Sequence, residues 1–251
     1  MKIGFSLVKN IYRLERKKKR QFGCIINSDM QKFIVKEKRA LLVVNCLAEH
    51  GDRRLLYLYR FIEKAGIGVA AHFLSSQYGL FSVLKDREAG ADLFFHRLLC
   101  VTGTPGIEAV DLFLQLHGRN KKVRFFDRWL DTMTLSHEIR RITVPGKLRL
   151  FYNLCCYGDS HSADMLAAGF KVTVGSRKIN ASAAVEYPLF CRYWSGDGLF
   201  SRKSVAVREA VRRADRRTVR QIQDRLAGRY FRNVDSKKII RGDGRITIDT
   251  L

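Results

Sequence analysis

One apolar run, Val110-Asp111-Leu112-Phe113-Leu114-Gln115-Leu116, leads into His117-Gly118. A second, Leu148-Arg149-Leu150-Phe151-Tyr152-Asn153-Leu154, leads into Cys155-Cys156-Tyr157-Gly158. Both runs are typical of strands buried on both faces of a sheet. If the two strands are neighbours, their ends place an imidazole beside a thiol. A cysteine nucleophile needs that pairing, because the thiolate is the reactive form and a nearby histidine produces and stabilises it.

Strand and helix patterns alternate along most of the chain, which predicts an α/β fold with a mostly parallel sheet and helices on both faces. In such sheets functional groups collect at the carboxyl ends of the strands, where His117 and Cys156 both lie. The further predicted elements are strands over 40–46, 67–74 and 171–174, and helices over 53–65 (ended by Gly66), 77–100, 134–141, 162–168, 181–194 and 204–226.

The length of 251 residues allows one large α/β domain or two small ones. Composition favours a single α/β domain over residues 38–230. Residues 1–37 are interpreted as a basic N-terminal appendage, and residues 231–251 as a polar C-terminal tail that follows a basic C-terminal helix.

The six cysteines match neither a zinc site nor a regular disulfide framework, so no metal and no cofactor is predicted. Cys46, Cys100 and Cys191 lie in apolar surroundings and are expected to be reduced core residues. A reducing compartment follows. No apolar run approaches the roughly 20 residues of a membrane span, and the first apolar patch is too short for a signal-peptide core. We therefore expect a cytoplasmic protein.

The formal net charge is +23, and the excess is concentrated in two segments. Residues 13–20 hold six basic side chains and one acid, and residues 202–229 hold ten basic side chains and three acids. Such an excess predicts an anionic partner, whether nucleic acid, a membrane surface or an acidic protein. The alternative is that these are solvated helix faces and a flexible arm. Neither segment interleaves aromatic residues with its charges as single-strand binders do.

The segments Leu116-His117-Gly118 and Cys155-Cys156-Tyr157-Gly158 resemble the catalytic strand ends of the caspase-like cysteine peptidases, a clan that includes caspases, metacaspases, clostripain-like and separase-related (CHAT-type) enzymes. The spacing from His117 to Cys156 is near the roughly 50 residues of the caspase order. The resemblance covers about residues 38–215, but only the two strand ends are specific.

The resemblance implies a cysteine endopeptidase that acts on protein or peptide substrates. Cys156 would be the nucleophile, and His117 would polarise it or protonate the leaving amine. The backbone N–H groups of Gly118 and Cys156 would form the oxyanion hole, and glycine at 118 would keep side-chain bulk away from the developing charge. Gly158 would allow a sharp turn after the nucleophile.

The sequence departs from the clan at two positions. Leu154 stands two residues before the nucleophile, where caspases carry Gln and metacaspases Asp, so neither an Asp nor an Arg/Lys cleavage preference is supported. Cys155 occupies a position that is usually Ala or Ser. Strand alternation decides which cysteine faces the cleft; Cys156 is favoured because x-Gly follows it. Asp159 and His161 are further candidate cleft residues, although a polar turn explains His161 equally simply.

A second hypothesis comes from a different class of protein. The chain could be a non-catalytic α/β module that binds nucleic acid or another anionic partner through residues 13–20 and 202–229. Labelling of Cys156 by an electrophilic peptide probe would distinguish an active peptidase from such a module.

Overall fold

The computed structural model describes residues 32–196 and 203–251. The chain divides into two compact units, 1–32 and 33–251, and the following description concerns the second. The predicted basic run over residues 13–20 and Cys24 lie outside the described residues. Among the residues that are described, no helix is both long and apolar enough to cross a membrane.

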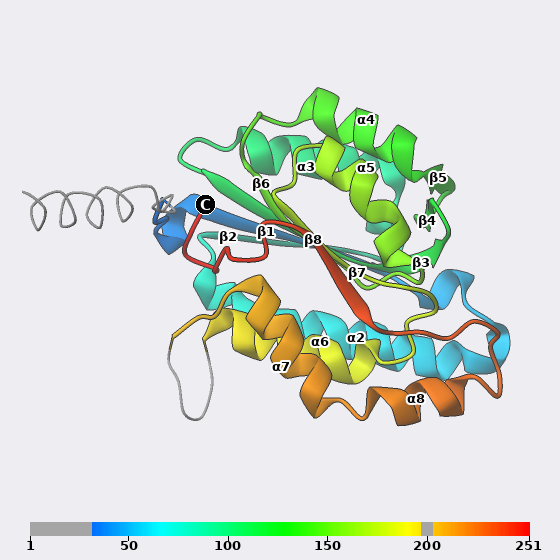
Figure 1. Ribbon diagram of the computed structural model, residues 1–251. Coiled ribbons are helices and arrows are strands. Elements are labelled where there is room, and N and C mark those ends of the chain that lie inside the picture. Colours follow the sequence, from blue (N-terminus) through cyan, green and yellow to red (C-terminus); the bar gives the residue numbers. More distant parts are fainter. Residues whose placement is uncertain (1–31, 197–202) are drawn as a thin grey trace, which may run out of the picture. The chain divides into compact units, whose positions relative to one another are not determined.

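The second unit is built on a twisted, mostly parallel sheet in the strand order β2-β1-β3-β6-β7-β8 (Figure 1). Its parallel strands are β1 (Arg39–Cys46), β2 (Leu80–Lys85), β3 (Ala109–Arg119), β6 (Leu148–Asn153) and β7 (Val172–Ser176). The last strand, β8 (Lys238–Gly242), runs antiparallel to β7. Two short strands, β4 (Lys122–Arg124) and β5 (Trp129–Asp131), extend the end of β3 as antiparallel ribbons. The predicted fold class is confirmed.

Helices cover both faces of the sheet (Figure 1). One face carries α3 (Ala91–Gly103), α4 (Thr132–Ile142) and α5 (Ser162–Ala167), and the other carries α2 (Leu56–Leu74), α6 (Ala183–Ser195) and α7 (Val207–Arg217). A short helix, α8 (Arg220–Ala227), follows α7. The 3-10 turns are η1 (Lys36–Lys38), η2 (Ala48–His50), η3 (Arg53–Leu55), η4 (Ser75–Gln77), η5 (Asp86–Ala89) and η6 (Gly158–His161).

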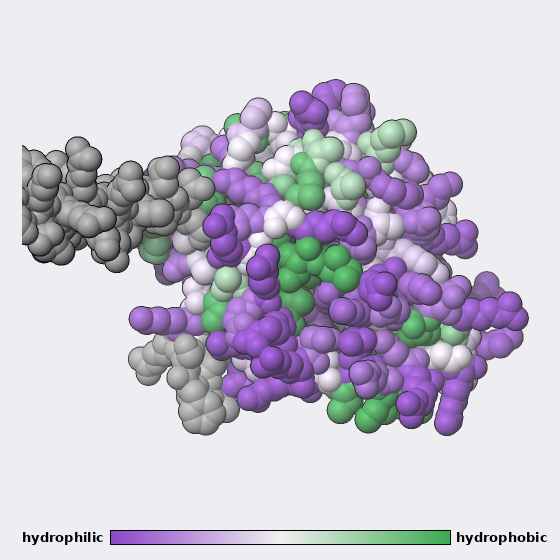
Figure 2. All heavy atoms as spheres, viewed as in Figure 1, coloured by the Kyte–Doolittle hydropathy of each residue, from purple (hydrophilic) through white to green (hydrophobic). Residues whose placement is uncertain are grey.

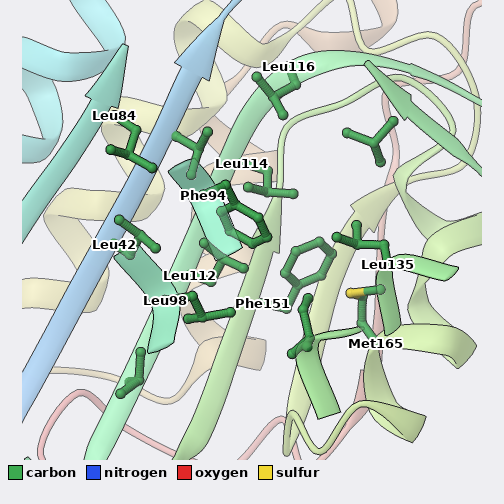
Figure 3. Close-up of a cluster of buried hydrophobic side chains, with 14 of the residues drawn as sticks. Leu42, Leu84, Phe94, Leu98, Leu112, Leu114, Leu116, Leu135, Phe151 and Met165 are labelled. Atoms are coloured by element: carbon green, nitrogen blue, oxygen red, sulfur yellow. The ribbon is translucent and has the colours of Figure 1, made fainter. Parts of the chain in front are cut away.

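Strand alternation divides the core into two apolar clusters, one on each face of the sheet. Leu112, Leu114 and Leu116 of β3 face α3, α4 and α5, where they pack with Phe94 and Leu135 (Figure 3). Phe113, between them, faces the other cluster with the aromatic side chains of α6. Each fully buried apolar side chain of this size contributes roughly 1.5–3 kcal/mol. The two clusters therefore hold β3 at the centre of the sheet.

Helix α2 corrects one prediction, because it does not end at Gly66. It runs for 19 residues, through the segment predicted as a strand over 67–74. A Cβ atom at Gly66 would lie 2.0 Å from Oε1 of Gln115 on β3. Gly66 thus permits close contact between helix and sheet and does not cap the helix.

The segment 77–100, predicted as mostly helical, is also partly wrong. It contains strand β2 at the sheet edge, followed by η5 and the start of α3. Edge position explains the mixed polarity that hid this strand, since only Ser82 and Leu84 of β2 are buried. Cys100, expected in the core, lies exposed on α3, whereas Cys46 and Cys191 are buried as predicted.

The C-terminal region differs from prediction in two ways. The helix predicted over 204–226 is broken at Thr218 and Val219 into α7 and α8, because Thr218 is extended and its hydroxyl donates to the carbonyl of Asp215. Residues 231–251, predicted as a tail, contain strand β8, which extends the sheet beside β7. Ile246 and Ile248 beyond it are buried in the core.

A buried ion pair ties this C-terminal segment to the sheet. Arg149 and Asp111 are fully buried and joined by two hydrogen bonds of 2.9 and 2.5 Å. Arg149 also donates to the carbonyl oxygens of Ile248 and Thr250. The Tyr78 hydroxyl completes the pair by donating to Asp111. Every charged atom is thereby satisfied, as burial requires.

Candidate active site

Strands β3 and β6 are direct neighbours, as their apolar runs predicted, and a bulge sets their register. Val110 pairs with Leu148, but Leu112 pairs with Phe151, so β6 has one extra residue opposite Asp111. Beyond the bulge the pairing continues to Leu114 and Asn153. His117 follows Leu114 by three positions, and Cys156 follows Asn153 by three positions. His117 is still within β3, whereas Cys156 lies in the turn that follows β6.

His117 is held by its ring nitrogen Nε2, which lies 2.7 Å from the carbonyl oxygen of Leu47. A carbonyl can only accept, so Nε2 carries the proton and Nδ1 keeps its lone pair. Glu63 of α2 holds this segment in turn, since its carboxylate accepts the N–H groups of Leu47 and Ala48. The ring of Tyr59 packs edge-on against His117, with the ring centroids 5.2 Å apart. Burial lowers the pKa of His117, so the imidazole is neutral at pH 7.

The two cysteines point in opposite directions. Cys155 is fully buried in the apolar cluster of Leu116, and this burial raises the pKa of its thiol to about 12. Cys156 is partly exposed and lies near Tyr59 of α2. Burial raises the pKa of the Cys156 thiol, while the backbone N–H of Asn180 and the Lys238 ammonium oppose that rise. Cys156 is therefore the accessible thiol of the pair.

Tyr59 connects the two candidate groups. Its ring contacts His117, and the negative charge of a Cys156 thiolate is one cause, after burial, of the raised pKa of Tyr59. His117 and Cys156 thus lie on the same face of the sheet, beside the same aromatic side chain. Within the described part of the chain no hydrogen bond joins the His117 ring to Cys156. Such bonds are often long before substrate binds and tighten in the complex.

At both Gly118 and Gly158 the backbone of a neighbouring segment lies so close that a side chain would not fit. A Cβ at Gly118 would lie 2.4 Å from the carbonyl oxygen of Cys156 and 2.7 Å from Cβ of Cys155. A Cβ at Gly158 would lie 3.0 Å from Cα of Gly175. Residues 155–157, which we call the Cys loop, lead from the end of β6 to η6. The predicted turn function of Gly158 is wrong, since the left-handed residue of this loop is Tyr157, with φ of +58°.

A buried hydrogen-bond chain fixes the Cys loop to the end of β3. The side chain of Asn153 accepts the N–H of Cys155 through Oδ1 and donates through Nδ2 to Nδ1 of His161. The Nε2 atom of His161 lies 2.8 Å from the carbonyl oxygen of Arg119. Both ring nitrogens of His161 are used, and its side chain is fully buried. His161 therefore positions the loop and does not face a cleft.

Asp159, the other candidate cleft residue, is paired with Arg241 of β8. Two hydrogen bonds of 2.7 and 3.1 Å join the carboxylate and the guanidinium. Leu154 is buried in the apolar cluster on the α2 side of the sheet. Neither residue offers an unpaired polar group for selecting a substrate side chain.

Several residues of this site escape sequence reasoning. Leu47 contributes a carbonyl oxygen, which no side-chain pattern reveals. The sequence pattern marks Tyr59 only as an apolar position of its helix, and Asn153 only as part of a strand. Asn180 and Lys238 come from segments distant in the sequence: the β7–β8 pairing places Lys238, and Asn180 follows β7 and donates to the Leu154 carbonyl. The described residues contain no cluster of metal-ligating side chains.

Comparison with known proteins adds evidence on the fold alone. No family model matches the chain, and no curated protein matches its sequence. Among solved structures, the Drosophila initiator caspase Dronc superposes with a TM-score of 0.52. The fold is caspase-like. The match covers 88% of this chain and 87% of the Dronc chain at 13% sequence identity. At that identity the similarity extends to the architecture and to no particular residue.

Proposed function

We propose that this caspase-like chain is a cysteine endopeptidase in which Cys156 is the nucleophile and His117 the general base. The observation that carries the proposal is the arrangement of His117. Its Nε2–H is held by the Leu47 carbonyl, which leaves the lone pair of Nδ1 available on the face where Cys156 is the accessible thiol. A nucleophile, a base and a group that orients the base form the minimal arrangement for covalent catalysis.

The pKa directions favour a neutral resting pair. Burial raises the pKa of Cys156 and lowers that of His117, so at pH 7 the thiol is protonated and the imidazole is neutral. The imidazole then acts as a base at the moment of attack. The thiol proton moves to Nδ1 of His117 while sulfur bonds to the carbonyl carbon. The same proton passes to the leaving amine as the peptide bond breaks, and water hydrolyses the thioester.

The negative oxygen of the tetrahedral intermediate requires two N–H donors, and Gly118 and Cys156 are the candidates. The β3–β4 hairpin has a two-residue turn, so Arg119 and Lys122 form its hydrogen-bonded pair. Gly118 belongs to the next, non-hydrogen-bonded pair, and its N–H points away from β4. The backbone of Gly118 also lies against that of Cys156. This geometry supports an oxyanion hole between the two strand ends.

The fold and the residue before the Cys loop suggest the substrate class. Caspase-like architecture is suited to binding an extended peptide at the strand ends, and the buried Leu154 provides no charged selector. We therefore propose protein substrates without a strict Asp or Arg/Lys requirement at the cleavage site.

The test is cleavage of a quenched fluorescent peptide library by the full chain. Replacement of the nucleophile in Cys156→Ser should abolish cleavage, and His117→Gln should lower kcat/KM by at least about 100-fold. Cys155→Ser is the matched control, because its thiol is buried in the core and should not take part. Cleavage that persists in Cys156→Ser, or that is lost only in Cys155→Ser, would contradict the assignment.

A further inference from the structure

Helix α8 exposes its apolar side chains to solvent instead of burying them in the core. None of its residues is buried. Ile222 and Leu226, one helical turn apart, are 56% and 50% exposed. Val219 before the helix and Tyr230 after it are 58% and 83% exposed and continue the same stripe. We call these four residues the α8 stripe. A surface helix normally buries such a stripe against its own domain.

Polar contacts attach α8 to the domain. Asp224 accepts the backbone N–H and the hydroxyl of Ser236, in the segment that leads into β8. Arg220 pairs with Asp215 at the end of α7 and with Asp224. The side chains of Arg220 and Asp224 are only 20% and 14% exposed. The polar side of the helix therefore faces inward, and the apolar stripe faces solvent.

Arginines without an acidic partner flank the stripe in the sequence. Residues 216–232 contain six arginines and a single acid, Asp224. Asp224 is occupied by Arg220 and Ser236. In the described part of the chain no carboxylate pairs with the remaining exposed arginines, which are Arg216, Arg217, Arg225, Arg229 and Arg232. Where Figure 1 places α8, Figure 2 shows hydrophobic side chains at the surface among hydrophilic ones.

We propose that the α8 stripe and its arginines bind the surface of an anionic lipid bilayer. Exposed aliphatic and aromatic side chains enter the boundary between headgroups and acyl chains, and flanking arginines pair with anionic headgroups. This inference is independent of the peptidase proposal, because it uses no residue of the candidate active site.

Three other occupants of this surface fit it less well: a second copy of the chain, its own basic run, and nucleic acid. A second copy of the chain would form a two-fold contact that brings arginines against arginines. The basic run at residues 13–20 carries the same sign of charge. Nucleic acid would satisfy the arginines, but its phosphate backbone would leave the aliphatic stripe exposed to water.

The test is flotation of the full chain with vesicles of phosphatidylcholine alone or of phosphatidylcholine mixed with phosphatidylserine. The wild type should float with the anionic vesicles and not with the neutral ones. The variant Ile222→Ser/Leu226→Ser should lower the partition coefficient at least about tenfold, from the lost transfer of two apolar side chains. The variant Arg225→Gln/Arg229→Gln should lower it about tenfold at low salt, and less at high salt.

The matched control is Arg87→Gln/Arg140→Gln, which removes two exposed positive charges from other elements and should partition like the wild type. Residues 1–31 are present in every variant, so a difference between variants belongs to α8. Wild-type partition of the serine variant would overturn the proposal. A second result would also overturn it: the wild type binds duplex RNA, the arginine variant does not, and vesicle binding is the same in all variants. That result would assign the surface to nucleic acid.

Discussion

Two histidines, the half-buried His117 and the fully buried His161, have different tasks near the candidate active site. In His117, Nε2 is the one ring nitrogen with a hydrogen-bond partner among the described residues, so Nδ1 keeps its lone pair. His161 uses both nitrogens, to Asn153 and to the Arg119 carbonyl, and so holds the Cys loop in place. Sequence reasoning places both near the site but cannot separate the roles. The difference depends on hydrogen-bond partners that come from other segments.

The two histidines also make the stability of the fold dependent on pH. Burial lowers the pKa of both, whereas unfolding returns them to about 6.5. The unfolded state therefore binds more protons, and the stability gained from neutral histidines is complete above pH 6.5 and lost as pH falls below it. Each histidine should contribute a slope of up to about 1.4 kcal/mol per pH unit in the free energy of unfolding.

Denaturant unfolding between pH 7.5 and 5 measures this slope. His161→Gln should flatten it, because one proton-binding group of the unfolded state is removed. His137→Gln is the control, since His137 is 74% exposed and should leave the slope unchanged. Paired carboxylates lose their contribution only at lower pH, below about 4.5. An equal slope in the wild type and His161→Gln would contradict this interpretation of His161.

At the scale of elements, the bulge opposite Asp111 sets the register of β6 against β3. Without the extra residue on β6, every position of β3 from Leu112 onward would face the preceding position of β6, and Leu114 would pair with Tyr152 instead of Asn153. Asp111 stabilises the bulge, because its carboxylate accepts the N–H of Leu150 and pairs with Arg149. The alternation of cysteines is a matter of strand geometry that the sequence leaves open. In the structure Cys155 is buried and Cys156 is partly exposed.

Asp111→Asn should therefore destabilise the protein strongly. It leaves Arg149 buried without its counter-charge, a change that costs about 3–5 kcal/mol of unfolding free energy. Asp92→Asn is the matched control, because Asp92 also pairs with an arginine, Arg128, but is 81% exposed. The control should hardly move the denaturation midpoint. Equal midpoints for the two variants would contradict a structural role for the buried pair.

The elements that sequence patterns predict well are those buried on both faces. Strands β1, β3 and β6 are continuous apolar runs, and all three are placed correctly. Patterns fail where tertiary contact overrides local preference. By pattern Gly66 ends a helix, whereas in the structure it allows a close contact with Gln115, and β2 is a half-exposed edge strand. β8 escapes prediction because α6, α7 and α8 separate it in the chain from its partner β7.

At the scale of the whole chain, three features with different proposed roles lie on different parts of the described structure. The carboxyl ends of β3 and β6 carry the candidate active site. The buried Asp111–Arg149 pair ties the C-terminal segment to the sheet. The α8 stripe presents an apolar, arginine-lined surface.

The central claim, that Cys156 is an activated nucleophile served by His117, is tested most directly by covalent labelling. The full chain is treated at pH 7 with a peptide acyloxymethyl ketone, and the modified residue is identified by mass spectrometry. The account predicts labelling of Cys156 that is unchanged in Cys155→Ser, at least about 100-fold slower in His117→Gln, and absent in Cys156→Ser. Labelling of Cys156 at the same rate with and without His117, or labelling of another cysteine in its place, would contradict it.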